Sequence, residues 1–238
     1  MEVGKSVKLY TMNKKITSLI PFYNESDNIL SILKMLTNVS QISQIICIDD
    51  GSKNNLYEKI KKSFPNVELI QNKINIGKAG SIFKATEKSN NEDVLLLDAD
   101  LVDLSVNEVS HAIDLYKTNN LDMLILENKG DNNFIDSILR KTIIQSGKRI
   151  LTKTDLLKIA KRAPEKYQLE VAINQYMHLH NKKIAWIKSN SFNPHKKKKI
   201  GLIKGIIEDH KMNMSIVNYL GLKDYISQLL FFCKKEII

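Results

Sequence analysis

The sequence has few of the residues that would crosslink a small fold or carry it across a membrane. Its 238 residues include two cysteines, Cys47 and Cys233, too few for a disulfide framework or a cysteine metal cluster, and this pair fits a reducing, cytoplasmic setting. No stretch approaches the roughly 18 apolar residues of a membrane-spanning helix, and the first ten residues lack the apolar centre of a signal peptide. Nine glycines and four prolines are spread thinly, which excludes collagen-like and low-complexity chains. With 43% hydrophobic and 26% charged residues, we expect a globular protein that buries its own core.

Charge is distributed unevenly along the chain. Residues 1–100 carry 13 Lys and Arg against 12 Asp and Glu, whereas residues 101–238 carry 23 against 14. The second half therefore holds nearly all of the formal net charge of +10. A basic surface of this kind attracts an anion: nucleic acid, an anionic lipid headgroup or a phosphorylated substrate. Composition alone leaves these three open.

Short apolar runs alternate with segments of helical periodicity between Ile16 and Leu126. One helical segment places Ile29, Leu33 and Leu36 on a single stripe, and we expect Ser26 to cap it by accepting from first-turn amides. Continuous apolar strands separated by helices predict a doubly wound α/β fold with a parallel sheet covered on both faces. The apolar runs are 16–20, 44–48, 67–70, 93–97 and 121–126, and further helices are expected near 55–63, 78–88 and 105–118.

The pattern changes after residue 126. A polar loop leads to expected helices at about 133–145, 153–161 and 165–180, then to a strand-like run at 183–188. Two helices follow the lysine run Lys196 to Lys199. The last one has an apolar stripe with lysines nearby, which suits either packing on a core or contact with an anionic membrane leaflet. The stripe consists of Leu222, Tyr225, Ile226, Leu229, Leu230 and Cys233.

Polar residues follow four of the apolar runs. Ligands of an open parallel sheet sit beyond the carboxyl ends of its strands, so we expect these four segments to converge on one cleft. The segments are Pro21 to Glu25, Asp49 to Ser52, Asn75 to Ser81 at a helix start, and Asp98 to Asp100.

The pair Asp98 and Asp100 is the clearest candidate for chemistry. Residues two apart in an extended chain point to the same side, so both carboxylates can face one ligand. Two such oxygen donors can hold Mg²⁺ or Mn²⁺, which takes the rest of its shell from water and substrate phosphates. The alternative is a turn that caps the next helix. The buried strand before the pair and the three other polar strand ends favour a site.

The other two central segments fit a nucleotide. Asp49-Asp50-Gly51-Ser52 has the composition of a turn, in which one carboxylate can accept from a ribose hydroxyl or a base N–H while the other orients the loop. Asn75-Ile76-Gly77-Lys78 opens a helix, whose free amides and dipole favour phosphate. It matches neither the P-loop nor the Gly-x-Gly-x-x-Gly pattern.

Four motifs together carry a resemblance to a known family. LIPFYNESDNI, IICIDDGS, NINIGKAGSI and LLLDADL, in this order, resemble the family 2 glycosyltransferases with the GT-A fold, near the polyprenyl-phosphate sugar transferases and their soluble bacterial relatives. The resemblance covers about residues 15–105. It implies a doubly wound, mostly parallel sheet with helices on both faces and a helical C-terminal extension. One continuous catalytic domain would comprise a nucleotide-sugar-binding half, 1–126, and an acceptor-side half, 127–238, with the basic loop and the amphipathic helices.

The resemblance also implies roles for individual residues. It places Pro21, Tyr23, Glu25 and Asp49 in the nucleotide pocket, Asp98 on ribose or metal, and Asp100 on the metal. A looser likeness covers Ser146 to Arg149, Thr154 to Leu156 and Tyr167 to Glu170, which are similar to a segment with acceptor and catalytic residues; a loop and an amphipathic helix fit equally well. Asn193-Pro194-His195 and the lysines after it resemble a late loop that supplies a His to the metal and cations to the diphosphate. A surface position is the alternative for His195.

The implied activity is transfer of one sugar from a UDP- or GDP-sugar with Mg²⁺ or Mn²⁺. The acceptor would be lipid-linked or part of the cell envelope, at the cytoplasmic face of the membrane. Lys78 and Arg149 would stabilise developing charge, and Glu170 is the candidate base if the acceptor is an alcohol. The sequence lacks Gln-x-x-Arg-Trp, the motif of processive synthases, and a trailing pair of membrane helices, so we expect single-sugar transfer and peripheral membrane contact.

Two other functions remain open. A nucleotidyltransferase acting on a sugar phosphate also uses an α/β nucleotide cleft, but its first loop is usually rich in Gly and Lys or Arg, unlike PFYNESDN here. A nonenzymatic basic protein that binds RNA or anionic lipid would explain the charge and leave the four polar strand ends unexplained. We expect no nucleic-acid partner.

Overall fold

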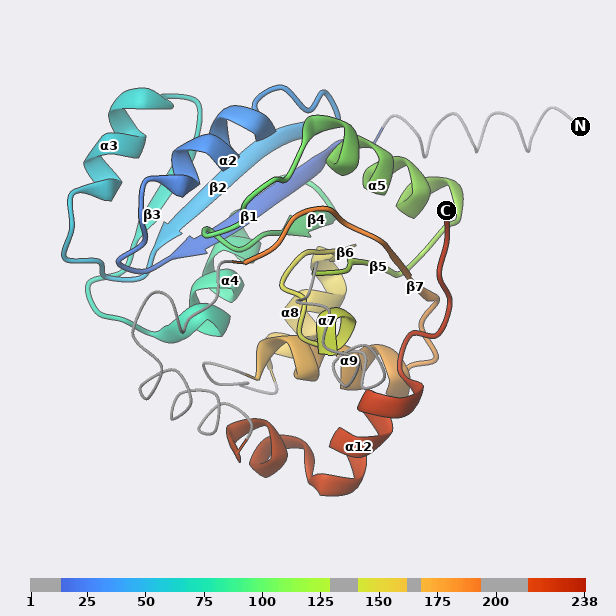
Figure 1. The fold of residues 1–238 in the computed structure, drawn as a ribbon. Helices are drawn as coiled ribbons and strands as arrows, with labels where there is room; N and C mark the ends of the chain where they lie inside the picture. The colour runs from blue at the N-terminus through green and yellow to red at the C-terminus, as the bar shows by residue number, and fades with distance from the viewer. Residues whose placement is uncertain (1–13, 129–140, 162–167, 194–213) are drawn as a thin grey trace, which may run out of the picture.

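A seven-stranded sheet runs through the computed structural model, which describes residues 14–128, 141–161, 168–193 and 214–238 (Figure 1). Its strand order is β3-β2-β1-β4-β6-β5-β7. β6 pairs antiparallel with both of its neighbours, and the other strand pairs are parallel. The expected mostly parallel, doubly wound α/β sheet is therefore confirmed. The strands are β1 (Ile16–Phe22), β2 (Ile42–Asp49), β3 (Glu68–Gln71), β4 (Asp93–Leu96), β5 (Met123–Leu126), β6 (Arg149–Thr152) and β7 (Ile184–Ile187).

Helices cover both faces of the sheet because successive strand residues point to opposite sides. Ile16 and Ile20 of β1 join the core beneath α2, α3 and α5, whereas Leu19 joins the core that contains α4, α7, α8, α9 and α12. Two buried layers explain why the strands read as unbroken apolar runs. The helices are α2 (Asn28–Leu36), α3 (Leu56–Ser63), α4 (Gly77–Lys88), α5 (Val106–Thr118), α7 (Lys141–Ile144), α8 (Lys153–Ala160), α9 (Leu169–Leu179) and α12 (Leu222–Phe231).

Strand β6 was not among the predicted strands. Arg149 at its start and Thr152 at its end leave only two apolar residues between them, so the segment does not read as an apolar run. Ile150 packs into one core layer and Leu151 into the other. Because β6 lies between β4 and β5, the second half of the chain completes the sheet of the first. The boundary expected at residue 126 stays a prediction.

The apolar stripe of α12 is divided between core and surface. Tyr225 and Leu229 are buried, whereas Leu222, Ile226 and Leu230 are 61%, 44% and 43% exposed. The stripe is therefore wider than the surface on which the helix packs. Within the described ranges, no helix is both long enough and apolar enough to span a bilayer.

Helix capping corrects one expectation from the sequence. Asp27, not Ser26, is the N-cap of α2, and its side chain makes no capping hydrogen bond; Ser26 Oγ does accept from a first-turn amide, that of Asn28, at a long 3.5 Å. Ser105 does cap α5, because its Oγ accepts from the Glu108 amide at 3.2 Å. The burial of Ile29 and Leu33, rather than a cap, holds α2 in place.

These two serines form a matched pair for measurement. Ser105→Ala should lower the free energy of unfolding by about 1 kcal/mol, because an amide of α5 loses its acceptor. Ser26→Ala should change it by less than about 0.5 kcal/mol. Urea denaturation followed by circular dichroism measures both, and equal effects would contradict the assignment.

Candidate active site

The loops after β1 and β2 are joined by hydrogen bonds through one asparagine. The Asn24 amide donates to Ser52 Oγ at 2.9 Å, and the Lys53 amide donates to Asn24 Oδ1 at 2.8 Å. Asn24 has a φ of 50°, a conformation that Asn tolerates better than most residues. The first two strand ends therefore lie side by side, as expected.

The residues expected to hold the nucleotide surround this junction. Pro21 is a buried residue of β1 opposite Ile48 of β2. Tyr23 is 44% exposed, and the Glu25 carbonyl accepts from Asn54 Nδ2 at 3.0 Å. Tyr23 is thus the most accessible of the expected nucleotide residues on β1 and the loop after it.

The two adjacent aspartates at the end of β2 make different contacts. Asp49 is fully buried; its Oδ1 accepts from the Ser52 amide at 2.8 Å and its Oδ2 from Gln71 Nε2 at 3.0 Å. Asp50 accepts from the Ile76 amide at 2.9 Å and from the Gly77 amide at 2.8 Å. Asp50 therefore orients the segment that starts α4, and Asp49 holds its own turn and the end of β3.

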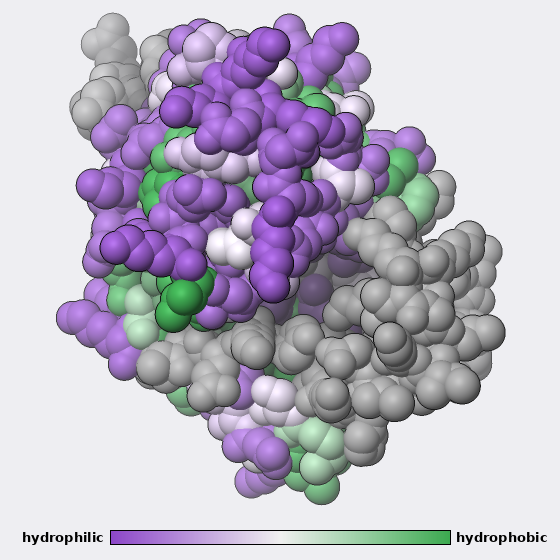
Figure 2. All heavy atoms as spheres, turned by 90° about the vertical axis from the view of Figure 1, so that its left-hand side faces the viewer, coloured by the Kyte–Doolittle hydropathy of each residue, from purple (hydrophilic) through white to green (hydrophobic). Residues whose placement is uncertain are grey.

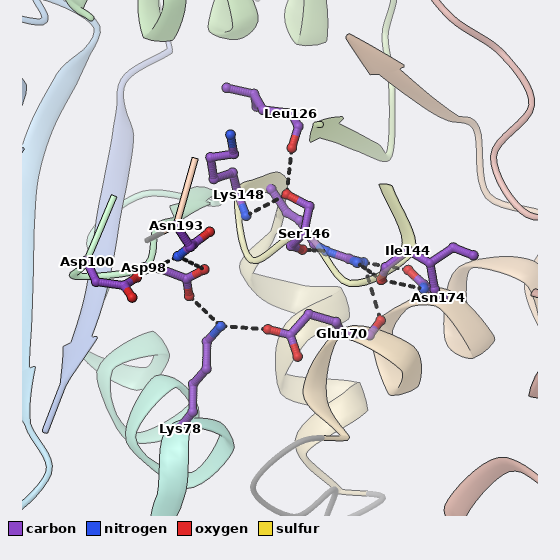
Figure 3. A network of polar contacts seen from close by, with 11 residues as sticks. Lys78, Asp98, Asp100, Leu126, Ile144, Ser146, Lys148, Glu170, Asn174 and Asn193 are labelled. Atoms are coloured by element: carbon purple, nitrogen blue, oxygen red, sulfur yellow. Dashed lines mark hydrogen bonds and ion pairs between the residues drawn. The ribbon is translucent and has the colours of Figure 1, made fainter. Parts of the chain in front are cut away.

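Lys78, Asp98 and Glu170 form a chain of ion pairs at the centre of the site (Figure 3). Lys78 Nζ lies 2.5 Å from Asp98 Oδ1 and 2.6 Å from Glu170 Oε1, and their side chains are 29%, 19% and 14% exposed. Burial alone would raise the pKa of Asp98, but Lys78 and a hydrogen bond from Asn193 lower it below its ordinary value. Burial likewise lowers the pKa of Lys78, yet the two carboxylates raise it by more. These opposing effects keep Lys78 and Asp98 charged at neutral pH.

Asp98 and Asp100 point to the same side, as expected. Asn193 Nδ2 donates to Asp100 Oδ1 at 2.5 Å and lies 3.3 Å from Asp98 Oδ2. Gly147 lies against Asp98, since a Cβ there would be 2.4 Å from Asp98 Oδ2. A side chain at position 147 would therefore displace the carboxylate.

This donor set fits a divalent cation. Among the described residues no three His, Cys, Asp or Glu side chains are grouped so as to hold a metal. Mg²⁺ usually takes one or two protein carboxylates and completes its shell with water and phosphate oxygens, which Asp98 and Asp100 satisfy. His195, the expected third ligand, and the lysines 196–199 lie outside the described residues.

Arg149 is placed differently from what its expected role requires. It is fully buried, and its guanidinium donates to the carbonyls of Ser146 (2.7 Å) and Ile144 (2.6 Å) and to Asn174 Oδ1 (2.5 Å). Nη1 also lies 3.3 Å from the Glu170 carbonyl. Burial lowers the pKa of Arg149 to about 10, which leaves it charged. Its described contacts hold the backbone carbonyls of Ile144, Ser146 and Glu170 in place.

Lys148 is a functional candidate that sequence reasoning named only within a loop. It is fully buried, and Nζ donates to Ser189 Oγ at 2.7 Å and to the carbonyls of Glu127 and Ser191 at 2.8 and 2.9 Å. Burial lowers its pKa to about 8, against partial opposition from Glu108. The sequence does show two consecutive basic residues, Lys148 and Arg149, before an apolar pair. In a strand they would point to opposite sides of the sheet, so at least one of them would be buried.

Comparison with known proteins identifies a family. The sequence model described as Glycosyl transferase family 2 matches residues 17–177. A 74-residue segment is 42% identical to an uncharacterized protein of Methanocaldococcus jannaschii, covering 29% of this chain and 31% of that protein. A 99-residue segment is 27% identical to an uncharacterized glycosyltransferase of Synechocystis, covering 39% of this chain and 31% of that protein. The chain thus matches about a third of the length of these relatives.

Solved structures of glucosyl-3-phosphoglycerate synthase from Mycobacterium tuberculosis share the fold. The complex with phosphoglyceric acid has a TM-score of 0.70 at 11% identity, over 91% of this chain and 84% of that one. The complex with Mn²⁺ and UDP-glucose has a TM-score of 0.70 at 13% identity, over 91% and 83%. This likeness confirms the expected GT-A fold.

The low pKa of Lys148 predicts a pH-dependent stability. Between pH 8 and 10.5 the unfolded chain keeps a proton on Lys148 that the folded protein has lost, so stability rises with pH. The free energy of unfolding of the wild type minus that of Lys148→Met should increase by about 2 kcal/mol from pH 7 to 9.5. Denaturant titrations at several pH values measure this difference. A difference that stays flat or falls would show that Lys148 keeps its ordinary pKa.

Proposed function

Because the chain belongs to glycosyl transferase family 2, we propose that it transfers a single sugar from a nucleotide-sugar donor to an acceptor with the help of a divalent cation. The observation that carries this proposal is the group formed by Lys78, Asp98 and Asp100 where β4 ends beside the start of α4. Two carboxylates can bind a metal ion that contacts a diphosphate, and a lysine at a helix N-terminus can contact the diphosphate itself. The similar synthase structure contains Mn²⁺ and UDP-glucose, which supports the choice of ligands.

Each residue of the site has a part in the proposed reaction. Asp98 and Asp100 would hold Mg²⁺ or Mn²⁺, which when bound supplies Lewis-acid assistance to the leaving diphosphate. Lys78, which contacts Asp98, would move its ammonium group to the donor phosphates when the donor binds. It lies at the start of α4, where the helix dipole favours anions. Glu170 is the proposed base for an alcohol acceptor, and a phosphate acceptor would need none. We assign Arg149 a positioning role through its contact with the Glu170 carbonyl.

The donor nucleoside would lie over the ends of β1 and β2. Tyr23 and Glu25 are the proposed contacts there, with Pro21 shaping the strand end beneath them. Asp49 would support this pocket by holding the turn at Ser52, since both of its oxygens already accept hydrogen bonds. UDP and GDP are the donor diphosphates we propose.

We place the acceptor at a membrane surface, as a lipid-linked or cell-envelope molecule on the cytoplasmic side. The support is the outer face of α12, where Leu222, Ile226 and Leu230 are exposed together. Figure 2 shows apolar atoms at the lower end of the molecule, where α12 lies. Lys234 Nζ lies 4.9 Å from the centre of the Phe231 ring, so a cation borders the apolar face. Apolar residues beside lysines favour an anionic leaflet.

Two rival functions make different predictions. A nucleotidyltransferase on a sugar phosphate would need basic residues after β1, where this chain has Tyr23, Asn24 and Glu25. A nonenzymatic RNA or lipid binder would show a steep salt dependence and no effect of changing Asp100. The composition of the loop after β1 favours the glycosyltransferase over the first rival, and the acidic pair favours it over the second.

Nucleotide and cation should stabilise the protein only together. UDP or GDP should raise the melting temperature when Mn²⁺ or Mg²⁺ is present, because diphosphate and cation complete each other's coordination. Asp100→Asn should abolish the cation-dependent part of the shift, since it removes a charge and keeps the shape. Asp103→Asn, at an exposed aspartate three residues away, is the matched control and should behave as wild type. Differential scanning fluorimetry measures all three, and an unchanged shift in Asp100→Asn would remove the cation from the proposal.

The proposed membrane contact can be tested on α12. Replacing Leu222, Ile226 and Leu230 together by Ser should weaken binding to vesicles containing phosphatidylserine by roughly tenfold or more, because the apolar contact with the bilayer is lost. The melting temperature should hardly change, since all three are exposed. Leu179→Ser, at a residue 59% exposed on α9, is the control. Vesicle sedimentation at several salt concentrations measures binding; equal binding of the triple variant and wild type would refute the contact.

A further inference from the structure

We propose that Asn193 is a protein ligand of the divalent cation, supplying its Oδ1 beside Asp98 and Asp100; this step rests on the proposed function. Among the described residues, no third His, Cys, Asp or Glu side chain lies near enough to Asp98 and Asp100 to hold a metal with them; Glu170 is joined to Asp98 only through Lys78. Asn193 contacts both carboxylates through a single nitrogen atom. It is therefore the neutral side chain already placed where a third ligand would lie.

The two ends of the Asn193 amide have different surroundings. Nδ2 lies between the carboxylates, 2.5 Å from Asp100 Oδ1 and 3.3 Å from Asp98 Oδ2 (Figure 3). Oδ1 is buried and has no hydrogen-bond partner among the described residues. Leaving a buried carbonyl oxygen without a partner is unfavourable, so Oδ1 is an acceptor that a bound cation could use.

Charge decides which end of the amide faces the carboxylates. Without a cation, two negative carboxylates favour the amide hydrogens of Nδ2. With a cation between the carboxylates, the same hydrogens would be repelled and the carbonyl oxygen attracted, because Mg²⁺ and Mn²⁺ prefer oxygen ligands. The terminal torsion of Asn is broad and roughly two-fold, so a half-turn exchanges Oδ1 and Nδ2 without moving the backbone.

The backbone that carries Asn193 is held firmly on the sheet side. The amide of Phe192 donates to the Val102 carbonyl at 3.2 Å, and the Val102 amide donates to the Phe192 carbonyl at 3.0 Å. Ser191 is anchored from below by Lys148, whose Nζ lies 2.9 Å from its carbonyl and 2.7 Å from its Oγ. Because the backbone before Asn193 is fixed in this way, only the terminal torsion of the side chain has to change when the cation binds.

Glu108 anchors the same segment from α5. Its Oε1 accepts from Ser189 Oγ at 2.5 Å and its Oε2 accepts from the Asn190 amide at 3.3 Å. Lys148 and Glu108 thus contact the same two hydroxyls, Ser189 Oγ and Ser191 Oγ. Both act on Asn193 only through the backbone, as positioning residues.

Removing the side chain gives opposite results for the two possible roles. If Oδ1 is a ligand, Asn193→Ala should weaken Mn²⁺ binding, by about tenfold on the scale of other losses around metal sites. If Asn193 only holds the carboxylates together through Nδ2, its removal leaves them repelling each other, and Mn²⁺ should bind equally well or more tightly. Asn190→Ala, at an exposed asparagine in the same segment, should bind as wild type. Electron paramagnetic resonance of free Mn²⁺, with and without UDP, measures the dissociation constants.

Two further measurements distinguish loss of a ligand from a folding defect and from failure of the proposed function. Asn193→Asp restores an oxygen donor and should bind Mn²⁺ at least as tightly as wild type. In wild-type protein labelled with ¹⁵N-asparagine, Mg²⁺ should shift the side-chain NH₂ signal of residue 193 and speed its hydrogen exchange, because Nδ2 leaves the carboxylates. If wild type binds Mn²⁺ and Asn193→Ala binds as well or better, the inference is wrong and the proposed function stands. If wild type binds no Mn²⁺ with UDP, the proposed function fails as well.

Discussion

The contact of Lys78 with Asp98 and Glu170 is the interaction on which the site depends. The lysine comes from α4, Asp98 follows β4, and Glu170 starts α9, so one ammonium group joins three elements from both halves of the chain. With side chains 14–29% exposed, the three charges are shielded from water and still open to a ligand. Removing one of these three charges would leave its partner unpaired and partly buried, which is costly. A bound ligand that carries charge can replace the missing partner. The same three side chains therefore contribute to the stability of the fold and to the proposed binding of the ligand.

Much of the fold and the centre of the site could be predicted from the sequence. Asp98 and Asp100 could be found because a buried strand ends directly before them, and Lys78 because it follows a glycine at a helix start. The adjacency of the four strand ends follows from parallel pairing alone. Residues whose position is set by their nearest strand or helix were therefore predictable.

Residues positioned by distant contacts were not predictable. Arg149 carries a charge and resembles a ligand of phosphate, but its guanidinium also donates to Asn174 and lies against the Glu170 carbonyl, and no local pattern links either residue to it. Lys148 is likewise held by residues about 40 positions later in the chain. Asn193 lies beside the carboxylates because Phe192 pairs with Val102, outside the named strands. In each case the tertiary structure overrides the ordinary preference of a polar side chain for the surface.

Strand β6 has a consequence for motion as well as for topology. Because it lies between β4 and β5 and pairs with both, the two halves of the chain are interleaved in one sheet. A hinge that separated the two halves would have to break three rows of backbone hydrogen bonds, β4–β6, β5–β6 and β5–β7, so the sheet prevents the halves from opening as rigid bodies. Any rearrangement around a bound ligand is then left to side chains and loops at the ends of the strands.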